Sequence, residues 1–101
     1  MSMYHCEGLV KEIAVKGGKV TFKLEPSAPY LFERKKDDGT MERSLLLVEP
    51  KSHTARIVNP AQDFIPRKPL DLNTLLIAKA NRMRICLDVT LKYIVEVLGV
   101  L

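Results

Sequence analysis

GLVKEIAVKGGKVTFKL, residues 8–24, contains two strand-like segments on either side of a pair of glycines. Glycine readily adopts the positive φ angles that tight hairpin turns require, so Gly17-Gly18 is typical of a two-residue turn. Residues 20–24 alternate between apolar and polar side chains, which is typical of a strand with one dry face. We therefore predict a β-hairpin over residues 4–25.

The first strand of this hairpin changes its apolar face part-way along. Cys6 and Val10 fall on even positions, whereas Ile13 and Val15 fall on odd positions. One extra residue in a strand exchanges the side chains that point inward with those that point outward. We expect a bulge or a sharp coil near residues 8–11.

The middle of the chain predicts further strands, whose number the sequence leaves open. Asp38-Gly39 is a hairpin-turn signal inside residues 30–49, so this segment forms a second hairpin in one interpretation. Residues 43–49 are apolar on both parities, which is typical of a central strand that is covered on both faces. Residues 54–58 predict one more short strand.

A single helix is predicted late in the chain. Three prolines in residues 59–69 favour a connecting loop, because proline cannot donate to a strand ladder. Residues 71–81 carry apolar side chains at helical spacing, with Asp71 placed to cap the start and Asn81 placed for a left-handed cap at the end. We expect this helix to be largely buried.

Two strands follow the helix, over residues 83–89 and 92–101. The resulting order, with one helix before a closing hairpin, resembles the OB fold, a five-stranded, partly open barrel whose helix lies between strands 3 and 4. The resemblance implies one mainly-β, OB-like domain over residues 1–101 that binds single-stranded nucleic acid. The segments that carry the resemblance are residues 8–13, 20–24, 72–80, 84–89 and 93–97.

Composition gives an ordinary globular chain with a modest basic excess. The 101 residues include 16 Lys and Arg and 12 Asp and Glu, a formal net charge of +4. The longest apolar run, Leu45 to Val48, is far too short to span a bilayer. The N-terminus lacks the basic and then apolar stretches of a secretion signal. We expect a cytoplasmic protein that does not enter a membrane.

The residues that could support catalysis or metal binding lack a local pattern. Cys6 and Cys86 form no zinc-ligand spacing, and we expect both to be reduced. His5 adjoins Cys6, but neighbours on a strand point to opposite faces. A pair between Cys86 and either His5 or His53 depends on tertiary structure alone. We therefore predict no enzyme, no metal and no cofactor, and we interpret Asp37-Asp38 as a solvated turn.

For nucleic acid, the resemblance implies a stacking platform on strands 2 and 3 and clamping loops at the barrel mouth. Phe22 shares its parity with core residues, so we assign it to the core. The candidate stacking residues are Tyr30 and Phe32, and the candidate phosphate contacts are Lys16, Lys19, Lys23, Arg34, Lys35, Lys36, Arg82 and Arg84.

A protein-interaction or oligomerisation module is the alternative function. The apolar tail over residues 97–101 ends without a charged residue. Such an edge strand adds readily to the sheet of a partner or of a second copy of the chain. This alternative predicts a homo-oligomer or a protein complex that survives high salt.

Overall fold

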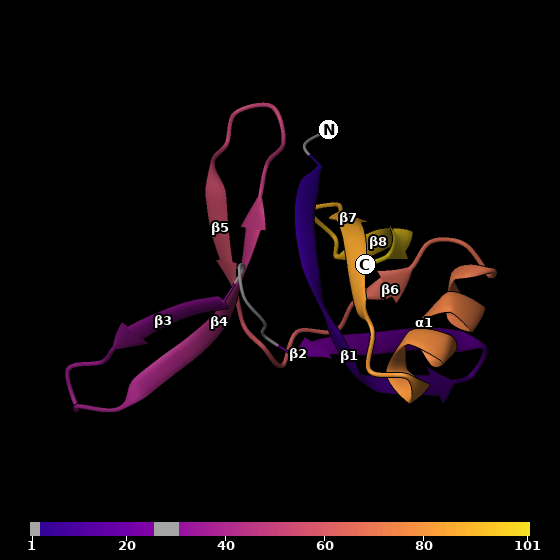
Figure 1. Cartoon of the computed structure of the whole chain (residues 1–101), viewed down its shortest axis with the longest axis horizontal. Coiled ribbons are helices and arrows are strands. Elements are labelled where there is room, and N and C mark those ends of the chain that lie inside the picture. Colours follow the sequence, from indigo (N-terminus) through magenta and orange to yellow (C-terminus); the bar gives the residue numbers. More distant parts are fainter. Residues whose placement is uncertain (1–2, 26–30) are drawn as a thin grey trace.

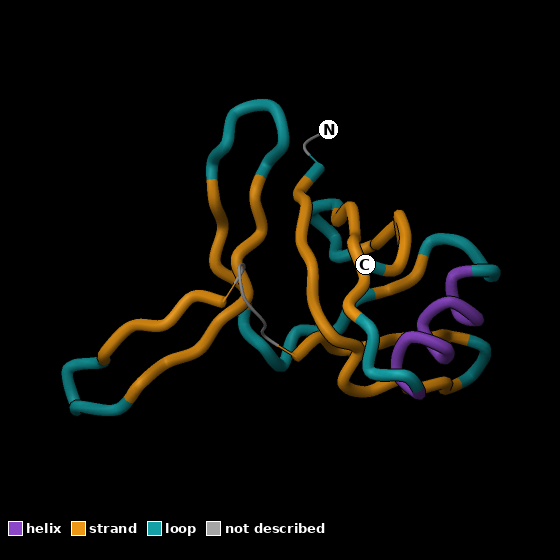
Figure 2. The backbone as a smooth tube through the Cα atoms, in the orientation of Figure 1, coloured by secondary structure: helices purple, strands orange, loops and turns teal. Residues whose placement is uncertain are grey.

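The computed structural model of the protein describes residues 3–25 and 31–101, which form eight strands and one helix (Figures 1 and 2). The predicted mainly-β fold with a single helix is confirmed for these residues. The elements are β1 (Tyr4–Lys16), β2 (Lys19–Glu25), β3 (Leu31–Lys35), β4 (Met41–Val48), β5 (Ala55–Val58), β6 (Ile65–Pro66), α1 (Asp71–Ala80), β7 (Arg84–Val89) and β8 (Ile94–Val100).

The long first strand, β1, organises the sheet. It pairs antiparallel with β2 along its second half and with β7 along its first half. The register with β2 shifts between Val10 and Glu12, so the bulge that the sequence predicts is confirmed. Gly17 and Gly18 turn the chain with φ angles of 55° and 78°, as the glycine pair indicates.

The sheet is not closed into a continuous barrel. Its strands follow the order β3-β4-β1-β7-β8-β6, with β2 added to β1 and β5 added to β4. Between β2 and the β6 region, the described residues form one bridge, in which Phe22 and Phe64 exchange two backbone hydrogen bonds of 2.9 and 2.7 Å. The eight strands exceed the five that the OB resemblance implies, because residues 31–58 form three strands, one of the possibilities that the sequence left open, and β6 is an additional short one.

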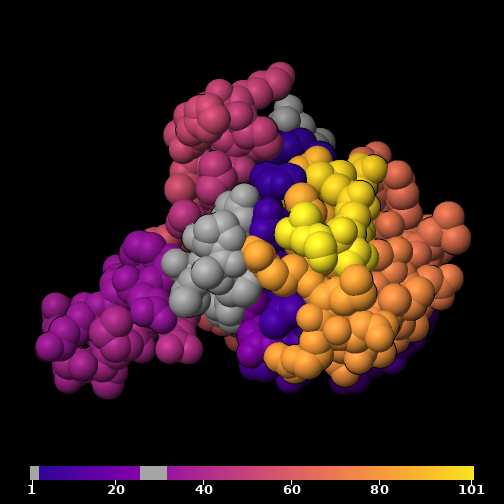
Figure 3. Space-filling model, in the orientation of Figure 1, coloured from indigo at the N-terminus to yellow at the C-terminus, as the bar shows by residue number. Residues whose placement is uncertain are grey.

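The three strands β3, β4 and β5 form a meander that projects from the rest of the molecule (Figures 1 and 3). The second hairpin and the short strand near residue 55 are therefore confirmed. A single register pair, His5 with Val48, joins β4 to β1. Leu45 and Leu47 are fully buried in the common core, so the base of the meander is anchored while its tip extends into solvent.

One apolar cluster joins the sheet to the helix. Phe22 and Phe64 pack with their ring centroids 5.6 Å apart, which places Phe22 in the core as predicted. The helix contributes only Leu75 and Ala78 to this cluster. Leu76 and Ile77 are about half exposed, so the prediction of a largely buried helix is wrong. The reason is geometric: their side of α1 has no strand beneath it among the described residues.

Both predicted caps of α1 are also wrong. Leu70 occupies the N-cap position, and Asp71 instead accepts a hydrogen bond from the backbone N–H of Val97 with a donor–acceptor distance of 3.3 Å. At the other end Asn81 has an ordinary φ of −98°, and the left-handed residue is Arg82, with φ 50°. Within the described ranges, no helix has the length and apolar character needed to cross a membrane.

Candidate nucleic-acid interface

Four of the predicted phosphate contacts already have carboxylate partners. Lys23 pairs with Asp63, and Arg34 donates to Glu42 at 2.6 Å. Arg84 donates to Glu7 at 2.5 Å, and Arg82 lies 3.6 Å from Glu25. These carboxylates reduce the local positive potential, so the four cations are weaker candidates for phosphate binding than their sequence positions suggest. The remaining predicted cations are Lys16, Lys19, Lys35 and Lys36.

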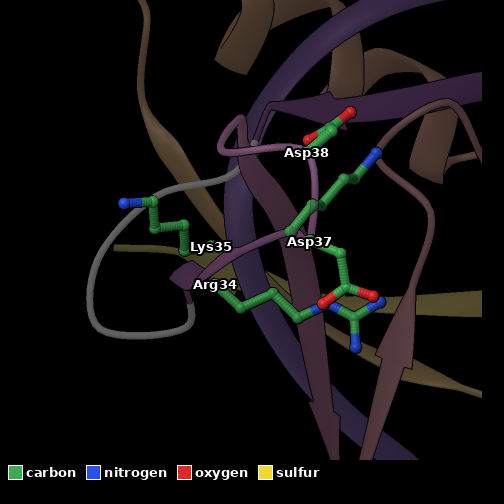
Figure 4. A pocket seen from close by; sticks show the side chains of 5 residues that line it. Arg34, Lys35, Asp37 and Asp38 are labelled. Carbon is green, nitrogen blue, oxygen red and sulfur yellow. The ribbon is translucent and has the colours of Figure 1, made fainter.

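Lys35 and Lys36 lie at the tip of the β3–β4 hairpin. Together with Asp37 and Asp38 they line a shallow hollow. Figure 4 shows Arg34 and Lys35 directed to opposite sides of the hairpin. Asp38 accepts hydrogen bonds from the N–H and the hydroxyl of Thr40, which lower the pKa of its carboxyl group. A fixed carboxylate among these cations opposes the binding of a phosphate.

The aromatic candidates do not form a platform among the described residues. Phe32 is half-buried on β3. Tyr30 lies outside the residues that the structure describes. Lys16 and Lys19 lie at the β1–β2 turn, at the opposite end of the molecule from the β3–β4 tip (Figure 1). The structure therefore divides the predicted site between two separate ends.

A groove that the sequence did not indicate lies beside the β1–β2 turn. Beyond the bridge between Phe22 and Phe64, β2 and the segment 65–69 diverge and leave a groove of about 520 Å³. Lys19 and Thr21 line one wall, and Ile65 and Arg67 line the other. The groove thus occupies the seam at which the sheet fails to close.

A second hollow, of about 390 Å³, shares the lining residue Arg67 with the first. It is lined by Thr90, Leu91 and Lys92 of the β7–β8 turn and by Ile94. We name the combined area the β6 surface, and its principal residues are Lys19, Thr21, Ile65, Arg67, Leu91 and Lys92.

All charged side chains that line the β6 surface are cationic. Lys68, at the edge of the groove, donates to Glu96 at 2.9 Å, and this bond lowers the pKa of the Glu96 carboxyl group. Lys19, Arg67 and Lys92 form no ion pair with another described residue. Three cations without an ion pair line the β6 surface with no acid among its described lining residues, whereas Asp37 and Asp38 lie among the cations of the β3–β4 tip.

The β7–β8 turn that borders this surface is held by an unusual stack. Tyr93 adopts a φ of 58°, which is rare for a bulky residue. Its hydroxyl accepts a hydrogen bond of 2.6 Å from Arg56, whose guanidinium lies 5.2 Å from the Tyr93 ring centroid and 5.9 Å from that of Tyr4. The edge of Tyr93 also meets Phe64 at 6.1 Å between centroids. Arg56 thus links Tyr93 of the β7–β8 turn to Tyr4 of β1.

Sequence reasoning identified Lys19 but missed Arg67 and Lys92. Arg67 lies in the proline-containing segment that we interpreted as a connecting loop. The available signal was the pair of adjacent cations Arg67-Lys68 between Pro66 and Pro69. Lys92 carried no signal, because its importance depends on where the β7–β8 turn packs.

Comparison of the chain with protein-family models, with curated proteins and with solved structures finds no match. Within residues 3–25 and 31–101, no group of three His, Cys, Asp or Glu side chains is arranged to hold a metal ion.

Proposed function

We propose that the protein binds single-stranded nucleic acid through the β6 surface, mainly by contacts to phosphates. The observation that carries the proposal is that three cations without an ion pair to another described residue, Lys19, Arg67 and Lys92, line the two hollows of the β6 surface. A backbone with one charge per nucleotide suits such a group of cations, because each neutralised phosphate releases counterions. The apolar side chains of Ile65 and Leu91 offer surface for the sugars and bases between these contacts.

The order of strand pairing supports the same function. Strands β2, β1, β7, β8 and β6 follow one another in the sheet, and the bridge between Phe22 and Phe64 links the ends of that series. This arrangement resembles an OB barrel in which the seam is only partly joined. The loops after the first and fourth strands of OB barrels bind oligonucleotides. Here the β1–β2 and β7–β8 turns take similar places on either side of β6.

The test is a titration of a fluorescein-labelled oligothymidine, and of its RNA counterpart, followed by fluorescence anisotropy at low and moderate salt. With three phosphate contacts we expect the logarithm of the affinity to fall with a slope of about −2 against the logarithm of the salt concentration. The double variant Lys19→Glu/Arg67→Glu is expected to bind about 10-fold more weakly or worse. A wild-type protein that gives no anisotropy change at low salt would remove the proposal.

The matched control is Lys35→Glu/Lys36→Glu. It changes the net charge by the same amount, but at the distant β3–β4 tip. We expect this control to retain affinity within about 2-fold, because charges beyond a Debye length are largely screened. Equal losses in the two double variants would show that binding depends on net charge alone and would contradict the assignment to the β6 surface.

A protein-interaction module is the second candidate, and the exposed end of β8 favours it. Leu98 and Leu101 are 50% and 59% exposed. Parallel pairing with β6 covers β8 only at Ile94 and Val95, so its later residues have a strand on one side only among the described residues. This function predicts a dimer or larger assembly that Leu98→Asp dissolves, measured by sedimentation at high salt. A monomer at all concentrations would contradict it.

A further inference from the structure

The outer face of β1 and β7 brings together a cysteine, a histidine and an aspartate. His5 lies directly opposite Asp88 in the antiparallel register, and Cys86 precedes Asp88 by two residues on the same face. The His5 Nδ1 atom lies 2.9 Å from Asp88 Oδ1, and the His5 Nε2 atom lies 3.0 Å from Cys86 Sγ. The two ring nitrogens therefore contact the carboxylate on one side and the thiol on the other.

Strand alternation separates this cluster from the core. Leu87 and Val89 point inward and are fully buried, so Cys86 and Asp88 on the same strand point outward and are half-buried. On β1 the inward residue is Cys6, and His5 takes the outward position. No local pattern in the sequence indicates this arrangement, because 81 residues separate His5 from Cys86.

The partners of His5 assign its tautomer and the role of each group. Asp88 is an acceptor, so Nδ1 carries the hydrogen that is donated to it. The Nε2 lone pair is then free to accept the proton of the Cys86 thiol. This is the general arrangement of a nucleophile, a base and an orienting carboxylate.

The resting thiol keeps its proton. Burial, followed by the charges of Glu7 and Asp88, raises the pKa of Cys86. The nucleophile therefore needs a base at the moment of reaction, and His5 is in contact with it. Cys6 has no such partner among the described hydrogen bonds, and burial raises the pKa of its thiol to about 12.

The approach to the sulfur lies over β8. Cys86 pairs with Gly99, which has no side chain, and a Cβ atom added at Gly99 would meet nothing within 4 Å. The space suits a small reagent. The charged groups that face the cluster are Glu7, Arg84, Asp88 and Glu96, with Val48 opposite His5 on β4. Glu7 is paired with Arg84 and Glu96 with Lys68, so Asp88 is the carboxylate of this group without a Lys or Arg partner among the described residues. Its charge disfavours an anionic reagent.

We propose that Cys86 is a reactive thiol site that exchanges with small neutral or cationic disulfides, with His5 as its base and Asp88 as the positioning residue. The Cys86 sulfur attacks one sulfur of the reagent as its proton passes to His5 Nε2. A new S–S bond forms, and the S–S bond of the reagent breaks. The departing thiolate takes the electron pair of that bond and then the proton from His5, so the products are a mixed disulfide at Cys86 and one free thiol.

The test uses the intact protein and neutral 4,4′-dithiodipyridine, with release of thiopyridone followed by absorbance. Mass spectrometry of the product locates the modification. We expect one equivalent of label at Cys86, none in Cys86→Ser, and slower reaction with the dianionic reagent 5,5′-dithiobis(2-nitrobenzoate). Substitution His5→Gln is expected to slow the reaction about 10-fold or more, since it removes the base. His53→Gln, at the exposed second histidine, is the matched control and is expected to keep the wild-type rate.

The pH dependence of the wild-type rate keeps the proposal testable if His5→Gln does not fold. A base in contact with the thiol predicts a rate that reaches a plateau below the pH at which the thiol itself ionises. A rate that rises tenfold per pH unit without a plateau would contradict the role of His5. A folded His5→Gln variant that reacts at the wild-type rate, or label found at Cys6, would also overturn the proposal.

Discussion

Gly8 lies on β1 against the last two residues of β2, Leu24 and Glu25. A Cβ atom at this position would lie 3.2 Å from the backbone oxygen of Glu25 and 3.5 Å from Leu24 Cβ. The carbonyl cannot move without moving β2, so only glycine fits this crossing without a shift of one strand. The need for glycine here comes from the close approach of two backbones, because the φ of Gly8 is ordinary.

The substitution Gly8→Ala is expected to destabilise the protein by about 1–2 kcal/mol, through overpacking against a backbone atom. Gly99→Ala is the matched control, since Gly8 and Gly99 pair with adjacent residues of β7 and a Cβ at Gly99 meets nothing within 4 Å. We expect the control to be neutral or slightly stabilising, because alanine reduces the entropy of the unfolded chain. Urea denaturation measures both variants, and equal effects would show that the contact at Gly8 relaxes freely.

Single residues also show where prediction from sequence ends. Phe22 could be assigned to the core because its neighbours alternate, and Gly17 and Gly18 could be assigned to a turn because glycine tolerates positive φ. Both signals are local. The contact between His5 and Cys86 depends on the register of β1 against β7, which no neighbouring residue encodes.

At the scale of elements, α1 ends in a backbone hydrogen-bonding motif that could not be located from the sequence. Met83 donates to the carbonyl of Ala78 at 2.9 Å, and Arg82 donates to that of Lys79 at 3.3 Å. These two bonds form a Schellman motif, in which the residue after the C-cap is left-handed. We predicted Asn81 for that place because asparagine tolerates the left-handed region, but Asn81 is the C-cap itself and the next residue, Arg82, is the left-handed one.

The substitution Arg82→Gly is expected to stabilise the protein by about 0.5–1 kcal/mol, because glycine adopts a positive φ without the penalty that a Cβ imposes. The ion pair lost with Glu25 is solvent-exposed and contributes little. Arg82→Ala is the control, since it loses the same ion pair and keeps the unfavourable Cβ. Chemical denaturation is expected to place Arg82→Gly above wild type and Arg82→Ala at or below it. The reverse order would contradict the assignment of strain to this residue.

The elements differ in how far their sequences determine them. The hairpin of β1 and β2, its bulge and the strand β7 follow from alternation and glycine placement. The groove beside β6 could not be predicted from such local patterns, because it arises where β2 and residues 65–69 diverge after a single bridge. The exposure of Leu76 and Ile77 was missed for a related reason: an apolar sector on a helix indicates the need for a partner but not whether the fold supplies one.

For the whole molecule, the two ends of the sheet differ in how many neighbouring strands each strand has and in how deeply its side chains are buried. At one end β7 is flanked by β1 and β8, and its inward residues Ile85, Leu87 and Val89 are fully buried. At the other end, β3 and the first half of β4 are paired only with each other among the described residues, and the tip of their hairpin is exposed (Figure 3). Strand β4 spans both environments, since Met41 is exposed whereas Leu45 and Leu47 are fully buried and pair with β5.

This gradient predicts how native-state hydrogen exchange is distributed. Amides of β7 are expected to exchange most slowly, near the rate set by global unfolding, because opening them requires disruption of the core. Within β4, we expect the amides near Met41 to exchange at least about 100-fold faster than those of Leu45 to Leu47, because only local fraying is needed to open the tip. The comparison within one strand controls for solution conditions and for overall stability. Equal protection along β4 would mean that the projecting hairpin opens only with the core, and the molecule would then unfold as one unit rather than from its free end.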